Sequence, residues 1–253
     1  MQQIFIVFAF ALSSISLTPD FAYSASPEDA NYERVKELIT SQRILTALSV
    51  VNRSLESHPN SARLLYQRAQ IIAILGDNYS AIDDLERAIE LSPDFIEAYS
   101  LLSLFWRLYD RNELKASEVR RLAVIRNPNS AAAFALRGRD RQRDKQKNLD
   151  DYERAVELEP AAPQFRISIL NWYRVNADPT ESLEQAKSAN QQFPEDVDIS
   201  IMLAKAFQTV AKPNKALHQM KALVEQHPDN PSPYLALAAF YRSVGDNDAE
   251  FDT

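Results

Sequence analysis

The feature that most constrains this chain is a proline that returns at nearly constant intervals. Each of these prolines ends a stretch whose apolar residues have helical spacing, and the successive intervals are 34, 35, 32, 34 and 34 residues. The six positions are Pro59, Pro93, Pro128, Pro160, Pro194 and Pro228. Proline stops a helix because it lacks an N–H and clashes with the preceding turn. A period of this length indicates an array of small, repeated helical units.

Each unit is predicted to contain two helices. In the clearest one, the first helix carries one apolar face formed by Leu65, Ala69 and Ile72. The second helix carries a face formed by Ala81, Leu85 and Ala88. Residues at these spacings lie on the same side of a helix. Gly76 and Asp77 separate the two helices, and glycine readily adopts the left-handed conformation of such a turn. The small alanines favour close packing of the pair.

Composition supports an all-α fold and excludes several functions. Glycine occurs only three times. Thirty-five acids oppose 28 bases, which argues against general nucleic-acid binding. The chain has no cysteine, so disulfides, thiolate nucleophiles and cysteine-ligated zinc are excluded. The three histidines are scattered, and His58 and His227 directly precede a proline, where a cation suits the C-terminal end of a helix.

The repeated residues resemble the tetratricopeptide repeat (TPR), a unit of 34 residues with the pattern W-x2-L-G-x2-Y, then A-x3-F, then A and P. The resemblance covers residues 28–245, with six copies in phase and a seventh partial copy. It implies an all-α superhelical solenoid of about six and a half helix-turn-helix repeats.

Three units depart from the pattern. The third has one extra residue between Asp110 and Leu114, which we place in its internal turn. The fourth is predicted to have a short turn, within the most charged run of the chain, residues 137–147. The seventh has only its first helix, which either caps the array or leaves an apolar surface for self-association. We expect partial exposure there of Leu235, Leu237 and Tyr241.

Both ends of the chain are predicted to lie outside the repeats. Ile4 to Leu17 is an apolar run with the length of a signal-peptide core, and Ala22-Tyr23-Ser24 is a plausible cleavage motif. We therefore predict a signal peptide at residues 1–24 and an exported, periplasmic or secreted protein. An uncleaved anchor, a buried first helix, and cleavage after Ala25 are the alternatives. Residues 246–253 form a short acidic tail. Beyond residue 25, no stretch is apolar enough to cross a bilayer.

The resemblance also implies a concave groove that is lined by the first helix of each unit and binds proteins or peptides. The places that line it hold mostly basic and amide side chains: Lys36, Tyr66, Gln70, Arg107, Arg139, Gln142, Arg143, Asn171, Arg174, Lys205, Gln208 and Arg242. The acids there, Asp29, Glu97 and Asp198, lie near helix starts, where a negative charge interacts favourably with the helix dipole.

Arg139 and Arg143 are four residues apart and are predicted to share one helical face. Because arginine binds carboxylates through two hydrogen bonds, we expect an acidic partner segment in units four to six. The alternative is a solvated surface, balanced by acids of the second helices such as Asp150, Asp151 and Glu153. The carboxylate clamp of co-chaperone members of this family is not expected, because only Asn171 matches its pattern.

No motif of a hydrolase, metalloprotease, P-loop or dinucleotide-binding protein is present. The acidic pairs Asp83-Asp84 and Asp150-Asp151 are expected to face solvent. We therefore predict no catalytic, cofactor-binding or metal-binding residues, and a non-catalytic interaction scaffold. The alternatives are self-association, or an accessory or regulatory subunit of a cell-envelope complex.

Overall fold

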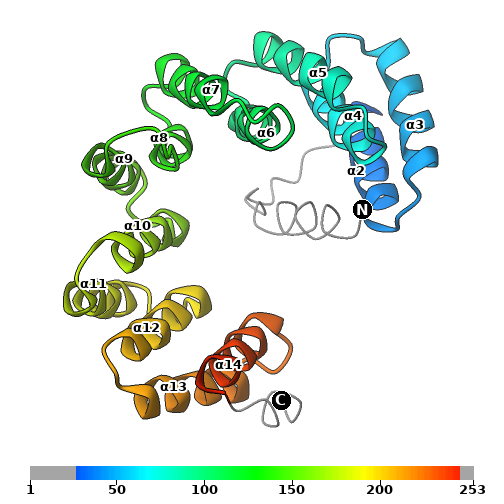
Figure 1. The fold of residues 1–253 in the computed structure, drawn as a ribbon. Coiled ribbons are helices and arrows are strands. Elements are labelled where there is room, and N and C mark those ends of the chain that lie inside the picture. Colours follow the sequence, from blue (N-terminus) through cyan, green and yellow to red (C-terminus); the bar gives the residue numbers. More distant parts are fainter. Residues whose placement is uncertain (1–26, 246–253) are drawn as a thin grey trace. The chain divides into compact units, whose positions relative to one another are not determined.

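The computed structural model describes residues 27–245, and this range is built from thirteen α-helices without a β-strand (Figure 1). The predicted signal peptide, residues 1–24, and the acidic tail, residues 246–253, lie outside the described residues. The helices are α2 (Pro27–Thr40), α3 (Ile44–Ser57), α4 (Ala62–Ile74), α5 (Asn78–Leu91), α6 (Ile96–Leu108), α7 (Glu113–Arg126), α8 (Ala131–Gly138), α9 (Lys145–Leu158), α10 (Pro163–Asn176), α11 (Pro179–Gln192), α12 (Val197–Thr209), α13 (Pro213–Gln226) and α14 (Pro231–Val244).

The helices belong to two compact units. Unit 1, which ends at Asn127, contains the pairs α2–α3, α4–α5 and α6–α7. Unit 2, which begins at Pro128, contains the pairs α8–α9, α10–α11 and α12–α13, followed by the single helix α14. Within each unit, the two helices of a pair pack on each other, and each pair packs on the neighbouring pair along the chain. This arrangement confirms the predicted all-α fold of six helix pairs and one additional helix. None of the described helices combines the length and apolar character needed to span a membrane.

The recurring prolines mark the helix ends as predicted. The second helix of every pair stops two residues before its proline, as α5 does at Leu91 before Pro93. Steric conflict with the proline ring forces the residue between them out of the helical conformation, and Ser92 accordingly has φ −135° and ψ 85°. His58 and His227 occupy this same C-cap position in α3 and α13.

Small residues allow the helices of a pair to approach closely, and larger side chains fill the space between pairs. Ala69, Ala81 and Ala88 are fully buried in the α4–α5 pair. Tyr99 and Phe105 of α6 are buried in the next pair. An aliphatic or aromatic side chain at the alanine positions would push the backbones apart, because protein interiors have no spare volume.

The turns inside the pairs confirm one sequence prediction and correct another. The α6–α7 turn is one residue longer than the α4–α5 turn, as expected. The α8–α9 turn, which was predicted to be short, is instead a loop of six residues, 139–144, because α8 ends early at Gly138. A Cβ atom on Gly138 would lie 2.6 Å from the ring of Tyr152, so only glycine permits this contact with α9.

Helix α14 covers the end of unit 2 more completely than the sequence predicted. Leu237 and Tyr241 are 2% and 8% exposed, and they pack with Ala204, Ala216 and Met220 of the preceding pair. The expectation that both are partly exposed is therefore wrong, whereas Leu235 is 62% exposed. The apolar surface available for self-association at this end is smaller than predicted.

The expectation that both acidic pairs face solvent is also wrong, because one member of each is buried. Asp84 accepts two hydrogen bonds from Arg68, at 2.7 Å from Nε and 2.5 Å from Nη2. Asp151 likewise accepts two hydrogen bonds from Arg137, at 2.9 Å from Nε and 2.7 Å from Nη2. In each case the arginine lies on the first helix of the pair, and the ion pair joins the two helices. Asp83 and Asp150 are exposed, as expected.

Candidate functional site

A basic cavity in unit 2 is the most distinctive site in the described chain. It has a volume of about 380 Å³ and lies between the α8–α9 loop and helix α10. Four cationic side chains line it, Arg139, Arg141, Arg143 and Lys145, together with Asp140, Asn171 and Trp172. We call this site the basic cavity. It includes three of the predicted groove residues: Arg139, Arg143 and Asn171.

The loop that carries these cations is held in place by buried polar groups. Asp140 is 1% exposed, and its carboxylate accepts a hydrogen bond of 3.0 Å from the backbone N–H of Gln142. The amide of Asn148 in α9 donates a hydrogen bond of 2.6 Å to the backbone carbonyl of Asp140. Because both contacts are local to α8 and α9, the loop presents its arginines from a defined backbone.

The arginines of the loop have different roles, and this difference corrects the predicted geometry. Arg139 is the C-cap of α8 and Arg143 lies in the loop, so the two do not share a helical face. The helix stops before Arg139, so the spacing of four residues no longer aligns the two side chains. Arg143 binds the buried Asp151 that Arg137 also binds. The alternative of balancing acids is therefore correct for Arg143.

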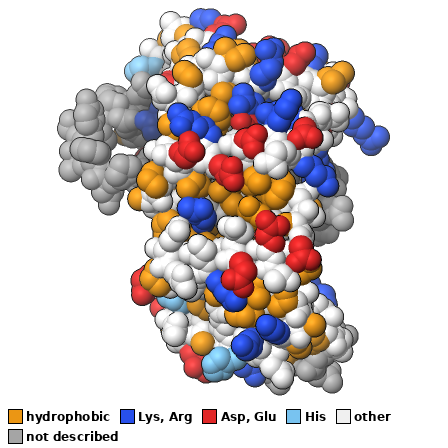
Figure 2. Space-filling model, turned by 90° about the vertical axis from the view of Figure 1, so that its left-hand side faces the viewer, with side chains coloured by type: hydrophobic (Ala, Val, Ile, Leu, Met, Phe, Trp, Pro, Cys, Tyr) orange, Lys and Arg blue, Asp and Glu red, His pale blue; other side chains and the backbone are white. Residues whose placement is uncertain are grey.

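Three cations of the basic cavity remain available to a ligand. Arg139, Arg141 and Lys145 are exposed, and each lacks an ion-pair partner among the described residues. The one carboxylate in the cavity lining is that of Asp140, which is buried and hydrogen-bonded. Elsewhere the charges are mixed, and Figure 2 shows a face on which basic and acidic side chains are interspersed. The cavity therefore concentrates positive charge within an acidic protein.

Helix α10 forms the other wall of the cavity. The indole N–H of Trp172 donates a hydrogen bond of 3.1 Å to the backbone carbonyl of Lys145, which ties α10 to the start of α9. The amide of Asn171 donates to the carbonyl of Ile167, one turn earlier, at 3.2 Å. Trp172 also contacts Tyr173 edge to face, with ring centroids 5.2 Å apart. This wall provides an aromatic surface beside the cations.

A second basic pair lies further along the first helices of unit 2. Burial lowers the pKa of Lys205 in α12, and repulsion from Arg174 in α10 lowers it further, while Asp198 partly opposes the shift. Burial also raises the pKa of Asp198. Gln208 donates a hydrogen bond of 2.6 Å to Ser243 of α14, and Arg242 is exposed on that helix. A half-buried lysine beside an arginine is a position where a bound anion is stabilising.

The predicted groove residues of unit 1 do not form a comparable basic surface. Lys36 pairs with Glu33 of its own helix at 3.6 Å. Tyr66 packs on Phe95, with ring centroids 5.0 Å apart, and burial raises its pKa well above the ordinary value. Gln70 is buried and Arg107 is half-buried. The basic character predicted for the whole groove is therefore concentrated in unit 2.

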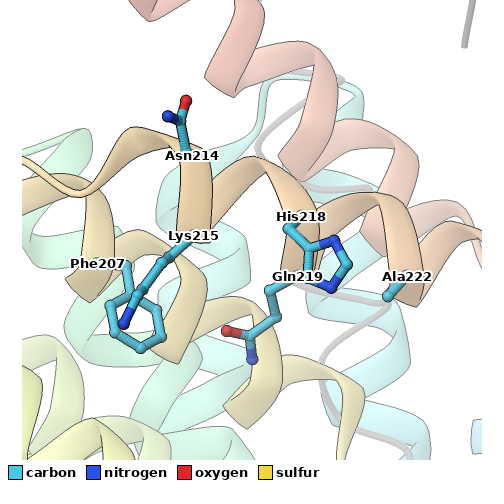
Figure 3. A pocket seen from close by; sticks show the side chains of 6 residues that line it. All are labelled: Phe207, Asn214, Lys215, His218, Gln219 and Ala222. Atoms are coloured by element: carbon cyan, nitrogen blue, oxygen red, sulfur yellow. The ribbon is translucent and has the colours of Figure 1, made fainter.

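Sequence reasoning missed most of the cavity lining, including two of its cations and its tryptophan, and it missed one further hollow. Arg141, Lys145 and Trp172 line the cavity, and the charged run of residues 137–147 was the signal that could have located the first two. A mostly apolar hollow of about 560 Å³ lies against α13, where the ammonium of Lys215 is 5.9 Å from the ring centroid of Phe207 (Figure 3). No predicted groove residue lines this hollow. Within residues 27–245, no group of three or more potential ligands could hold a metal.

Comparisons with known proteins identify the fold. No protein-family model matches the sequence, and no curated protein matches it. Among solved structures, the chain is similar to a thermophilic TPR protein of Thermus thermophilus, with 23% identity and a TM-score of 0.55, covering 72% of this chain and 99% of that one. It is also similar to a tetratricopeptide repeat protein of Parabacteroides merdae, with 13% identity and a TM-score of 0.63, covering 88% and 89%.

A third similar structure is PilW, described as a type IV pilus biogenesis factor, with 15% identity and a TM-score of 0.60, covering 84% of this chain and 97% of that one. Together with the tandem helix pairs, these likenesses show that the chain has the tetratricopeptide-repeat fold.

Proposed function

We propose that this protein is a non-catalytic interaction scaffold that binds an acidic segment of a partner protein in the basic cavity of unit 2. The observation that carries the proposal is the presence of three exposed cations, Arg139, Arg141 and Lys145, around one cavity. The fold supports this proposal only in a general way, because one fold serves many functions. The cavity supplies the specific chemistry.

The cavity suits one or two acidic side chains of an extended peptide. Its volume of about 380 Å³ lies within the range of small ligand pockets, roughly 300–1,000 Å³. Arginine donates two parallel hydrogen bonds to a carboxylate, so Arg139 and Arg141 orient an acidic side chain and attract it. Trp172 offers a flat surface for an apolar neighbour in the peptide. Arg174 and Lys205 extend the positive surface of unit 2 for a longer acidic segment.

The proposal is tested by titrating the full chain with a short peptide that contains several glutamates. The expected result is saturable binding that weakens at least about tenfold when the glutamates become glutamines, because charge-assisted hydrogen bonds are lost. The double variant Arg139→Gln/Arg141→Gln should weaken binding by a similar factor. Arg143 is left unchanged, because it binds the buried Asp151.

A matched control removes two exposed cations elsewhere in unit 2. Lys212→Gln/Lys221→Gln changes the net charge equally but lies outside the cavity. At physiological salt, which screens long-range electrostatic effects, this control should leave the affinity for the peptide within about twofold of that of the unmodified chain. Equal loss in both double variants, or unchanged binding in Arg139→Gln/Arg141→Gln, would contradict recognition in the cavity.

We also propose that the protein is exported and acts as an accessory subunit in the cell envelope. Two features support this proposal: the apolar run from Ile4 to Leu17, from which a signal peptide at residues 1–24 is predicted, and the likeness to PilW, described as a pilus biogenesis factor. Protein purified from its native host should begin at Ala25 or Ser26, as measured by N-terminal sequencing, and should fractionate with envelope or secreted proteins. An intact Met1 in the cytosolic fraction would refute export.

A further inference from the structure

The mostly apolar hollow against α13 has no role in the proposed function, and we call it the α13 hollow. Its volume of about 560 Å³ lies within the range of small ligand pockets, roughly 300–1,000 Å³. Phe207, near the end of α12, and Ala222 of α13 are its apolar lining residues. Among the described residues, no carboxylate lines it, and the ammonium of Lys215 lies near the ring of Phe207 (Figure 3). The α13 hollow therefore suits an apolar group that has negative charge beside it.

Contacts between α12 and α13 hold the walls of the α13 hollow in place. The amide of Gln219 donates a hydrogen bond of 3.2 Å to the backbone carbonyl of Ser200. Phe207 packs against the cluster of α12, α13 and α14 that includes Met220. Lys215 remains exposed at the rim and lacks an ion-pair partner within residues 27–245. The hollow is thus a formed site with an available cation.

The helices around the α13 hollow are basic, although the whole chain is acidic. Between Asp198 and Glu225 the sequence contains four lysines and no acidic residue. Lys212, the N-cap of α13, is exposed, and so are Lys215 and Lys221 of the helix itself. Charge complementarity therefore favours an occupant that carries carboxylates over a purely apolar one.

The acidic tail, residues 246–253, has the complementary pattern. It contains no base, and its acids occupy alternate positions: Asp246, Asp248, Glu250 and Asp252. In an extended segment, alternate side chains point to the same face, so the acids share one face. Phe251, the one aromatic residue of the tail, belongs to the opposite face. Phe251 can therefore enter an apolar hollow while the carboxylates on both sides of it stay at the rim.

The start of the tail lies beside the α13 hollow. Gln208, the neighbour of Phe207 in the sequence, donates a hydrogen bond of 2.6 Å to Ser243 of α14. Helix α14 ends one residue before Gly245, whose φ of 79° turns the chain away from the helix. From there the route to the hollow crosses the end of α12, one helix diameter or about 10 Å. Phe251 follows Gly245 by six residues, which span up to roughly 20 Å when extended.

We propose that the chain's own acidic tail binds the α13 hollow, with the ring of Phe251 inside it and with Glu250 and Asp252 at its rim beside Lys215. The charge of the tail, its aromatic residue and its reach all match the hollow. The bound tail holds α14 against α12 and α13, and it keeps four carboxylates away from the basic cavity. This interaction does not depend on peptide binding in the basic cavity.

The basic cavity is another cationic site in unit 2, but it is a less suitable destination for the tail. Helix α10 forms one wall of that cavity, and α12 lies between α10 and α14. The route from Gly245 therefore crosses at least two helices, about 20 Å, and requires a fully extended tail. The α13 hollow is reached with chain to spare.

The first experiment measures how often the tail leaves the hollow. Chymotrypsin cleaves after Phe251, and mass spectrometry of the intact chain follows the loss of the last two residues. Because cleavage requires the undocked tail, Lys215→Glu should accelerate it at least about fivefold, and Ala222→Trp, which fills the hollow, should do the same. Lys145→Glu is the matched control, because it makes the same change of charge in the basic cavity.

Lys145→Glu should leave the cleavage rate within about twofold of that of the unmodified chain. Far-UV circular dichroism should show equal helix content in all of these chains. Equal cleavage rates in the unmodified chain, Lys215→Glu and Ala222→Trp would show that the tail does not bind the hollow. Faster cleavage in Lys145→Glu alone would place the tail in the basic cavity. Either result would overturn the proposal.

The second experiment tests whether the tail binds within its own chain, and it uses the absence of cysteine from the sequence. Under mild oxidation, His218→Cys/Thr253→Cys should form a disulfide within one chain, since Cα atoms within about 7 Å can be bridged. Adding Phe251→Ser should slow this reaction at least about fivefold, because the local concentration of the tail at the hollow falls. Leu235→Ser, at an exposed position of α14, should not slow it. A disulfide-linked dimer, or a rate unaffected by Phe251→Ser, would contradict the proposal.

Discussion

At the scale of single residues, buried carboxylates determine where an arginine is indispensable. Among the described residues, Arg68 is the one cation that binds Asp84, whereas Asp151 is shared by Arg137 and Arg143. Arg68→Met leaves a buried carboxylate without a cation and should lower the free energy of unfolding by about 3 kcal/mol. Arg137→Met should cost about 1 kcal/mol, because Arg143 remains. Urea denaturation measures the free energy of unfolding of both variants. Equal losses in the two variants would show that Arg143 contributes little to holding Asp151.

The charge of Lys205 is expected to favour binding of an acidic peptide and to lower the stability of the folded chain. Its pKa is lowered by burial and by Arg174, so the folded chain holds this proton less tightly than the unfolded chain does. The resulting penalty is present at neutral pH and is relieved as the pH rises through the folded pKa toward the ordinary value of 10.5. Lys205→Met should therefore raise the melting temperature at pH 7 while weakening acidic-peptide binding.

Thermal unfolding and peptide titration of the same preparation check both effects. Lys221→Met, which replaces an exposed lysine of α13, should change neither quantity appreciably. A melting temperature that falls in Lys205→Met would show that attraction of the ammonium to Asp198 outweighs the cost of burying its charge.

At the scale of helices, local sequence signals predict the helix ends, but they do not predict the contacts between helices. Helix ends were predictable because each proline acts on the residue directly before it. The early end of α8 could not be predicted in this way, because it depends on the packing of Tyr152 against Gly138 and on the hydrogen bond from Asn148 to the loop. The same reason explains the missed ion pairs: no local pattern shows that Asp84 and Asp151 face an arginine on another helix. Two of the four cations of the site, Arg139 and Arg143, were predicted, but the grouping of all four around one cavity depends on the loop.

The contact between α8 and α9 makes Gly138 a sharp test of this account. Gly138→Ala places a Cβ atom 2.6 Å from the Tyr152 ring and should cost about 2 kcal/mol in unfolding free energy. In a Tyr152→Leu background the same substitution should cost clearly less, because the ring is absent. Gly76→Ala is the control. The φ of 95° at Gly76 makes alanine unfavourable there, but an added Cβ atom would have no neighbour within 4 Å. The cost of this substitution should therefore not depend on Tyr152.

At the scale of the whole molecule, stability in a repeat array is distributed between neighbouring pairs. The last described helix of unit 2 is α14, whose Leu237, Phe240 and Tyr241 cover the α12–α13 pair. Because each pair depends mainly on its neighbours, a defect at this end should weaken the nearest helices first. Unit 1 should retain its own stability, since its three pairs bury their apolar side chains against one another.

Phe240→Ala tests this distribution, because it removes a buried ring without truncating the chain. It should lower the stability of α12, α13 and α14 by about 3 kcal/mol, which native-state hydrogen exchange reports as faster exchange in these helices. Protection in α4 and α5 should be unchanged, and Leu235→Ala, at an exposed position of the same helix, should leave all helices protected. An equal loss of protection in both units would mean that the chain unfolds as one cooperative block. In that case α14 would stabilise every repeat, rather than only the pair it covers.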